Sequence, residues 1–261
     1  MDGIGLASFV ALVGLGIVAG IVNAIAGAGS LINIPLLAAV GMPHTVANAT
    51  NRIAVVVGGI TSAAAYRRAN QLPWELTRPL VLPMLIGSGL GAYLATILPD
   101  RWFRPIVGLE LLVLAGMLTF KPDIWLNPDP GGKNLSLSKR RLLFLAIGTY
   151  AGFLQAGVGF FLIATLVRQL GLDLVRSNAV KVVLTLAATV LSVGIFTVAG
   201  MMEWVPGLIL AVGNGVGGWV GAHLAVRKGA RWIRWVLVGT VVLAALEILG
   251  VYRAIGHLLG V

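Results

Sequence analysis

Long apolar stretches with almost no charge constrain the fold of this chain more than any other feature. Of its 261 residues, 58% are hydrophobic and only 11% are charged, which is more apolar surface than a soluble core can bury. A helix of about 20 residues spans the hydrocarbon core of a bilayer. Stretches that approach or exceed this length are residues 6–25, 46–66, 80–98, 103–120, 142–167, 175–199, 205–226 and 233–252. They predict an all-α polytopic membrane protein, because lipid admits only helices or closed barrels and the sequence lacks the alternation typical of a barrel.

The chain also repeats itself at an offset of 130 residues. The matched pairs are Trp74 and Trp204, Asn48 and Asn178, Gly87 and Gly217, and the runs 91–95 and 221–225. Duplicated halves of an apolar protein commonly enclose a transport site at their interface. We therefore expect two related membrane halves, and close helix packing for the repeated glycines Gly87 and Gly217.

Each half begins with an apolar segment that glycines interrupt. Residues 6–40 would measure about 52 Å as one helix, more than one span and less than two. The segment breaks at residues 23–30, and its second copy, residues 142–170, breaks around residues 155–159. We interpret each segment as two shorter helices that enter the membrane and return.

Positive charge in the loops distinguishes a hairpin from a single crossing. With hairpins, 14 Lys and Arg residues fall on one side and 3 on the other, whereas single crossings give 9 against 8. The asymmetry favours a hairpin plus three transmembrane helices in each half. Residues 1–120 form the first repeat, 121–141 a cytoplasmic linker and 142–261 the second repeat. An odd number of crossings inverts the second repeat, as in many transporters, and we expect a multi-pass protein of the cell inner membrane.

Two cations lie outside the loops. Arg52 and Lys181 each follow the repeated Asn-Ala pair. A cation in hydrocarbon costs about 3 kcal/mol and therefore needs a partner or water. An anionic substrate would be such a partner, with Arg52 offering a planar fork and Lys181 a compact charge. The alternative is that both side chains snorkel from a helix end to the membrane interface.

The interrupted helices supply neutral donors near these cations. Glycines let the backbone turn and expose amide groups that attract anions, although close packing of small residues is a competing explanation. The expected substrate-binding residues are Asn23, Gly27, Gly29, Ser30, Asn33, Asn48, Asn51, Arg52, Gln155, Gly157, Gly159, Asn178 and Lys181.

Other chemistry is disfavoured. The chain has no cysteine and no hydrolase, Walker, dinucleotide or metal-binding motif, so we expect no enzyme, catalytic residue, cofactor or metal. Glu110 and Glu247 are the acidic residues well inside spans, where they would either couple transport to protons or pair structurally. The expected partners are a small anionic substrate and the lipid bilayer, with a homodimer left open and nucleic acid excluded.

Two further segments carry a family resemblance. Residues 20–37, GIVNAIAGAGSLINIPLL, and residues 47–52, ANATNR, resemble the TauE/SafE sulfite exporter family of membrane permeases. Residues 66–70, YRRAN, before Trp74 are also similar to a stretch of that family. The resemblance implies export or exchange of small anions such as sulfite or organosulfonates by a secondary transporter with alternating access. A channel-like facilitator of another small solute and a non-transporting membrane subunit are the alternatives.

Overall fold

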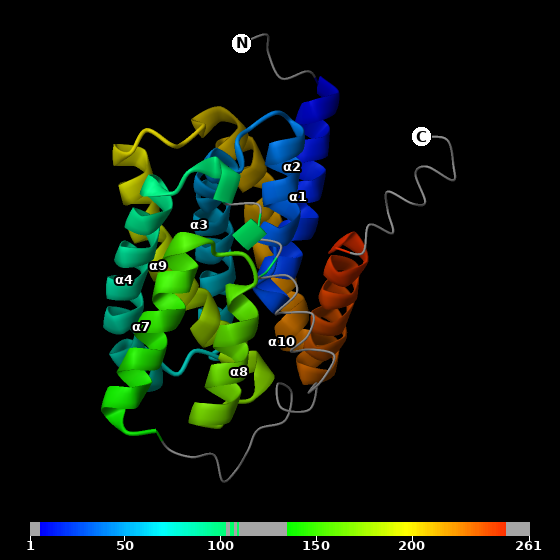
Figure 1. The fold of residues 1–261 in the computed structure, drawn as a ribbon. Coiled ribbons are helices and arrows are strands. Elements are labelled where there is room, and N and C mark those ends of the chain that lie inside the picture. Colours follow the sequence, from blue (N-terminus) through cyan, green and yellow to red (C-terminus); the bar gives the residue numbers. More distant parts are fainter. Residues whose placement is uncertain (1–5, 103–104, 107–108, 110–134, 249–261) are drawn as a thin grey trace.

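The structure is a computed structural model that describes residues 6–102, 105–106, 109 and 135–248, with the backbone alone for residues 6–8 and 241–248. Helices joined by short turns make up the described residues, and no strand occurs among them (Figure 1). The helices are α1 Leu6–Ala26, α2 Ser30–Ala39, α3 His44–Arg68, α4 Trp74–Ile97, α7 Leu137–Phe153, α8 Val158–Leu170, α9 Leu174–Val198 and α10 Trp204–Ile248. The predicted all-α class is confirmed, and the predicted helix at residues 103–120 lies almost entirely outside the described residues.

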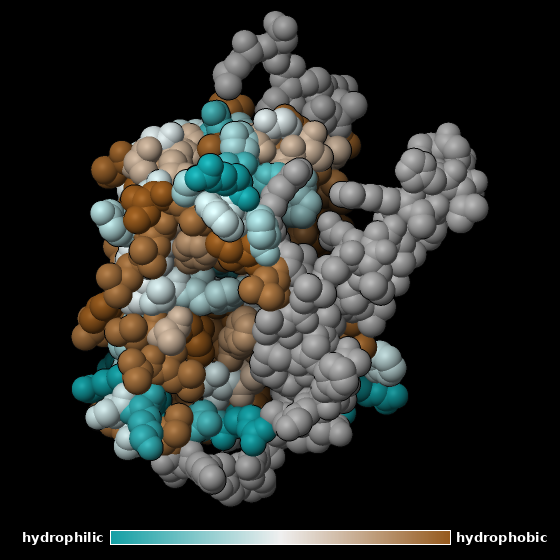
Figure 2. Space-filling model, viewed as in Figure 1, coloured by the Kyte–Doolittle hydropathy of each residue, from teal (hydrophilic) through white to brown (hydrophobic). Residues whose placement is uncertain are grey.

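Four of the described helices are long and apolar enough to cross a membrane. The qualifying stretches are Phe9–Ala26, Trp74–Ile97, Leu174–Val198 and Trp204–Thr240. Helix α3 is equally long but is not among them, because polar residues such as Asn48, Asn51 and Arg52 occupy its buried face. Figure 2 shows hydrophobic side chains around the middle of the visible face and hydrophilic ones toward its two ends. This distribution suits a protein surrounded by lipid.

Both predicted interruptions are present. Helix α1 ends before Gly27, whose φ of +70° is the left-handed conformation that favours glycine, and α2 then runs back beside α1. Helix α7 ends before the turn that contains Gln155 and Gly157, both at φ +64°, and α8 returns. We call α1 with α2 the first hairpin, and α7 with α8 the second hairpin. In Figure 1 the second hairpin lies in the lower part of the molecule and α2 in the upper part.

The ends of the two hairpins touch. The amide of Gly159 donates to the carbonyl of Gly27 at 3.4 Å. A Cβ atom on Gly27 would lie 2.3 Å from the Cα of Gly159, closer than real Cβ atoms approach. Glycine at both positions therefore allows the two backbones to meet near the middle of the molecule.

The first helix of each half packs against a helix of the other half. Helix α1 packs along α10, and α7 packs along α4. A Cβ atom on Gly217 of α10 would lie 2.1 Å from the carbonyl oxygen of Ile17, and one on Gly87 of α4 would lie 2.1 Å from that of Leu145. The repeated glycines thus perform the same task at both contacts, which confirms the close packing expected for them.

The last helix is bent where the sequence separates two apolar spans. Gly229 interrupts α10 with φ +69° and ψ −164°, values outside the helical range. The bend lies between the predicted spans 205–226 and 233–252. An apolar segment predicts only the membrane part of a helix, and the helix itself can begin earlier. Helix α4 starts six residues before the predicted span 80–98, and α7 starts five residues before the predicted span 142–167.

Alanine substitution tests the two glycine contacts. Gly87→Ala and Gly217→Ala place a methyl group against a backbone carbonyl, and overpacking of this kind costs about 1–3 kcal/mol. We expect both variants to lower the midpoint of thermal unfolding in detergent by several degrees. Gly194→Ala in α9 is the matched control, because its Cβ meets nothing within 4 Å. Equal midpoints in all three variants would contradict the close approach.

Candidate functional site

Arg52 of α3 holds the end of α7. Its side chain is fully buried and donates hydrogen bonds to the carbonyl oxygens of Ala151 at 2.6 Å and Gly152 at 2.8 Å. It also donates to the side-chain oxygen of Gln155 in the turn that follows. The last carbonyls of a helix lack intrahelical partners and carry partial negative charge. Arg52 therefore satisfies and neutralises the end of an interrupted helix.

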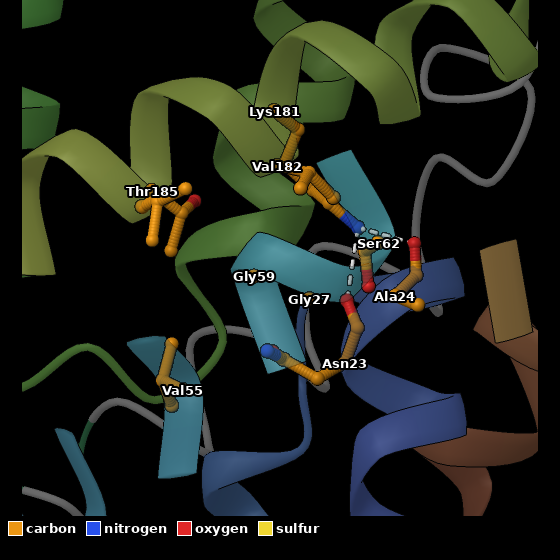
Figure 3. A pocket seen from close by; sticks show the side chains of 10 residues that line it. Asn23, Ala24, Gly27, Val55, Gly59, Ser62, Lys181, Val182 and Thr185 are labelled. Carbon is orange, nitrogen blue, oxygen red and sulfur yellow. Dashed lines mark hydrogen bonds between the residues drawn. The ribbon is translucent and has the colours of Figure 1, made fainter. Parts of the chain in front are cut away.

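Lys181 of α9 contacts the end of α1 in the first hairpin. Lys181 is only 1% exposed. Its Nζ atom donates to the carbonyl oxygens of Asn23 and Ala24, both at 3.0 Å, and to Oδ1 of Asn178 at 2.6 Å. Figure 3 shows these bonds to the end of α1. An ammonium group has three N–H donors, so all of them are used.

The two cation contacts are equivalent. Ala151 and Gly152 come 128 positions after Asn23 and Ala24, and Gln155 comes 128 positions after Gly27. Gln155 and Gly27 both have a left-handed backbone. Each half thus sends a cation to the same point in the other half, an arrangement we call the reciprocal cation contact.

The burial of Arg52 and Lys181 bears on the two interpretations of these charges, substrate binding and snorkelling to the membrane interface. Both side chains are buried within the protein, whereas a snorkelling side chain keeps its charged end in water, so burial argues against the snorkelling alternative. The two cations donate to carbonyl oxygens at helix ends, whereas a snorkelling side chain would donate to water. The described buried polar residues include no Asp or Glu, and neither cation forms an ion pair with a described residue. Among the described residues, the positive charge at this site is therefore offset by the dipoles of carbonyl and amide groups and, for Arg52, by the ring of Phe196 at 5.4 Å.

Amide side chains link the first hairpin to α3 and α3 to the second hairpin. Asn51 donates to Ser30 Oγ at 2.9 Å and accepts from Asn33 Nδ2 at 2.9 Å. Asn48 Nδ2 donates to the carbonyl of Phe153 at 3.0 Å. The structure brings these residues together, in direct contact with the helix breaks. Their hydrogen bonds, like those of the cations, are made to protein atoms.

The glycines of the breaks have different tasks. Gly27 and Gly159 form the contact between the hairpins, and Gly157 begins α8 in a left-handed conformation. A Cβ atom on Gly29 would lie 2.3 Å from the carbonyl of Ala19, so this glycine allows α2 to start close to α1. Close packing accounts for Gly29 by itself.

A polar face of α9 escaped the sequence analysis. Lys181, Thr185 and Thr189 lie four residues apart and therefore share one side of the helix. Thr189 Oγ1 accepts from Gln155 Nε2 at 3.0 Å and donates to the carbonyl of Thr185 at 2.7 Å. The face connects Lys181, at the first hairpin, with Gln155 and Arg52 at the second. Its spacing in an otherwise apolar helix was a usable sequence signal.

A small pocket lies beside Lys181, between the end of α1, α3 and α9. Figure 3 shows the side chains that surround it. The lining residues are Asn23, Ala24, Gly27, Val55, Gly59, Ser62, Lys181, Val182, Thr185 and Leu186. Three of the predicted site residues, Asn23, Gly27 and Lys181, therefore border one cavity, and none of its walls carries a carboxylate.

The two predicted coupling residues are not tested. Glu110 lies outside the described residues. Glu247 lies in the last turn of α10, in the part for which the backbone alone is described. Their proposed roles stay predictions.

Interrupted helices that meet at a buried polar centre, within an apolar helical shell, are typical of membrane transporters. The family model described as sulfite exporter TauE/SafE matches residues 12–248, and the chain belongs to this family. It is 28% identical to a probable membrane transporter protein, ORF9, of Sinorhizobium sp over 232 residues, 89% of this chain and 88% of the relative. It is 27% identical to a probable membrane transporter protein of Haemophilus influenzae, over 86% and 88% of the two chains. Identity to the probable membrane transporter protein YfcA of Escherichia coli K12 is 26%, over 90% and 85%. No solved structure matches the chain.

The contact between Thr189 and Gln155 generates a stability prediction. Thr189→Val keeps the side-chain shape but leaves Gln155 Nε2 without this acceptor. A lost buried hydrogen bond of this kind costs about 1–3 kcal/mol, so we expect a lower midpoint of thermal unfolding in detergent.

The control for this variant is Thr240→Val. Thr240 is also buried, but its hydroxyl bonds within α10 to the carbonyl of Val236. We expect the control to lose less than half as much stability. Equal losses in the two variants would argue against a structural role for the Thr189 contact.

Proposed function

We propose that the protein is a multi-pass secondary transporter of small anions, such as sulfite or organosulfonates, in the cell inner membrane. The observation that carries this proposal is the pair of fully buried cations, Arg52 and Lys181, with no described carboxylate beside them. In surroundings of low dielectric constant an unpaired charge attracts a counterion far more strongly than in water. Intramembrane cations of this kind commonly mark the path of a substrate or ion.

An anion would take over contacts that the helix ends now make. All three N–H groups of Lys181 Nζ are donated, to Asn23, Ala24 and Asn178. Arg52 donates three hydrogen bonds, to Ala151, Gly152 and Gln155, from its five N–H groups, and its Nε has no partner among the described residues. A full negative charge is a stronger acceptor than a neutral carbonyl. Binding would therefore weaken the hold of a cation on the opposite hairpin, which couples substrate binding to movement of that hairpin.

We further propose that the two halves are inverted repeats that give alternating access. Three observations support this: the equivalent glycine contacts of α1 with α10 and of α7 with α4, the reciprocal cation contact, and the meeting of the hairpins at Gly27 and Gly159. In Figure 1 the chain enters the first hairpin at the upper end and the second hairpin at the lower end. Movement of one hairpin against the other would open the centre toward one side of the membrane at a time.

Charge removal tests the proposed site. Arg52→Gln and Lys181→Gln remove the buried charges, and we expect each to reduce the flux of sulfite or a sulfonate into proteoliposomes at least tenfold. Arg68→Gln, at an exposed position, is the control and should transport like the wild type. Arg52→Lys keeps the charge and should retain measurable flux.

Folding has to be separated from transport in these variants, because each cation also holds a helix end. Only variants that elute as one species in size-exclusion chromatography are compared. Unchanged flux in folded Arg52→Gln and Lys181→Gln would contradict the cation site. Absence of flux in the wild type, together with tight co-purification of a partner protein, would favour a non-transporting subunit instead.

A further inference from the structure

One buried hydroxyl on the polar face of α9 lacks a partner. Thr185 is 9% exposed, and its Oγ1 forms no hydrogen bond with the described residues. A threonine within a helix commonly bonds to the carbonyl four residues earlier, as Thr189 does here. Leaving a buried hydroxyl unpaired is costly, so this donor calls for an explanation.

Thr185 lines the pocket beside Lys181. It lies one helical turn from that cation, on the same side of α9, and Figure 3 shows both residues at the pocket. The three protons of Lys181 are already donated to protein atoms, so the hydroxyl of Thr185 is the uncommitted donor of α9 at this place.

The wall that α3 contributes to the pocket consists of small residues, namely Val55, Gly59 and Ser62. Val55 stands 130 positions before Thr185, so this pair of equivalent positions faces the same cavity. A Cβ atom on Gly59 would come within 3.2 Å of Leu186 Cδ1. Glycine at position 59 therefore avoids a close contact with Leu186, and the hydroxyl of Thr185 lies on the opposite wall.

The geometry assigns Thr185 a role in substrate binding: its hydroxyl donates a hydrogen bond to an oxygen of the small oxyanion that Lys181 attracts into this pocket. This assignment rests on the proposed function and adds a residue to it. Thr185 also lies between Lys181 and the contact of Thr189 with Gln155, which leads on to Arg52. An anion bound to Thr185 is thus on the path between the two cations.

Loss of the hydroxyl tests this assignment. Thr185→Val keeps the shape of the side chain, and a hydrogen bond to a charged group contributes enough to change affinity about tenfold or more. In proteoliposomes supplied with sulfite, we expect the KM to rise at least tenfold while the kcat changes less than twofold, because binding is lost without altering later steps. Thr185→Ser restores the donor and should return the KM to within threefold of the wild type.

Thr240→Val is again the control, and its KM should equal that of the wild type. A second measurement uses detergent-solubilised protein: sulfite should raise the midpoint of thermal unfolding of the wild type and of Thr185→Ser, and much less that of Thr185→Val. A folded Thr185→Val variant with wild-type KM and wild-type stabilisation by sulfite would overturn the role of Thr185 while the cation site stands. A wild type that neither transports nor is stabilised by any small oxyanion would overturn the proposed function and this assignment together.

Discussion

The hold of each half's cation on the interrupted helix of the other half is the interaction on which the rest of the structure depends. A helix that ends inside a membrane leaves carbonyl oxygens without partners, and a cation buried there lacks water. Arg52 donates to such carbonyls at Ala151 and Gly152. Lys181 donates to the carbonyls of Asn23 and Ala24, which also accept from the Gly27 amide and the Tyr66 hydroxyl, so at both contacts the cation finds backbone acceptors in place of water. Neither the breaks nor the charges would be tolerable alone. Their combination also binds the two halves into one unit.

The same contact explains how a transporter of this kind would respond to its substrate. Carbonyl oxygens and an incoming oxyanion are acceptors for the same N–H groups, so occupancy by one disfavours the other. The hairpins meet through Gly27 and Gly159, where little side-chain volume resists sliding. A change at one cation is therefore transmitted to the end of a helix in the other half. Under the proposed function, this exchange is the physical link between binding and movement.

Much of the fold and part of the site could be predicted from the sequence. The breaks at residues 23–30 and 155–159 and the position of Arg52 and Lys181 outside the loops follow from apolar segments, glycines and loop charge, whereas burial and snorkelling of the two cations stayed alternatives. The partners of the cations could not be predicted, because they are backbone carbonyls, which every residue type possesses. The equivalence of the two contacts was also hidden, since Arg52 is shifted by one position against Lys181 and the first helices match at 128 positions instead of 130. Thr185 and Thr189 carried a readable spacing, but threonine alone does not reveal whether its hydroxyl is paired.

The sequence by itself determined that the chain forms membrane helices in two related halves, each with an interrupted segment and one isolated cation. These properties depend on residue type and spacing alone, so hydropathy, the repeat offset and the loop charges are enough to predict them. Tertiary structure alone decided that each cation reaches across to the other half and which neighbouring backbone Gly87 and Gly217 approach. It also decided that Thr185 borders a pocket with its hydroxyl unpaired. Such contacts join residues that are far apart in the sequence, for example Arg52 and Gly152 at a separation of 100 positions, so they exist only once the helices have packed.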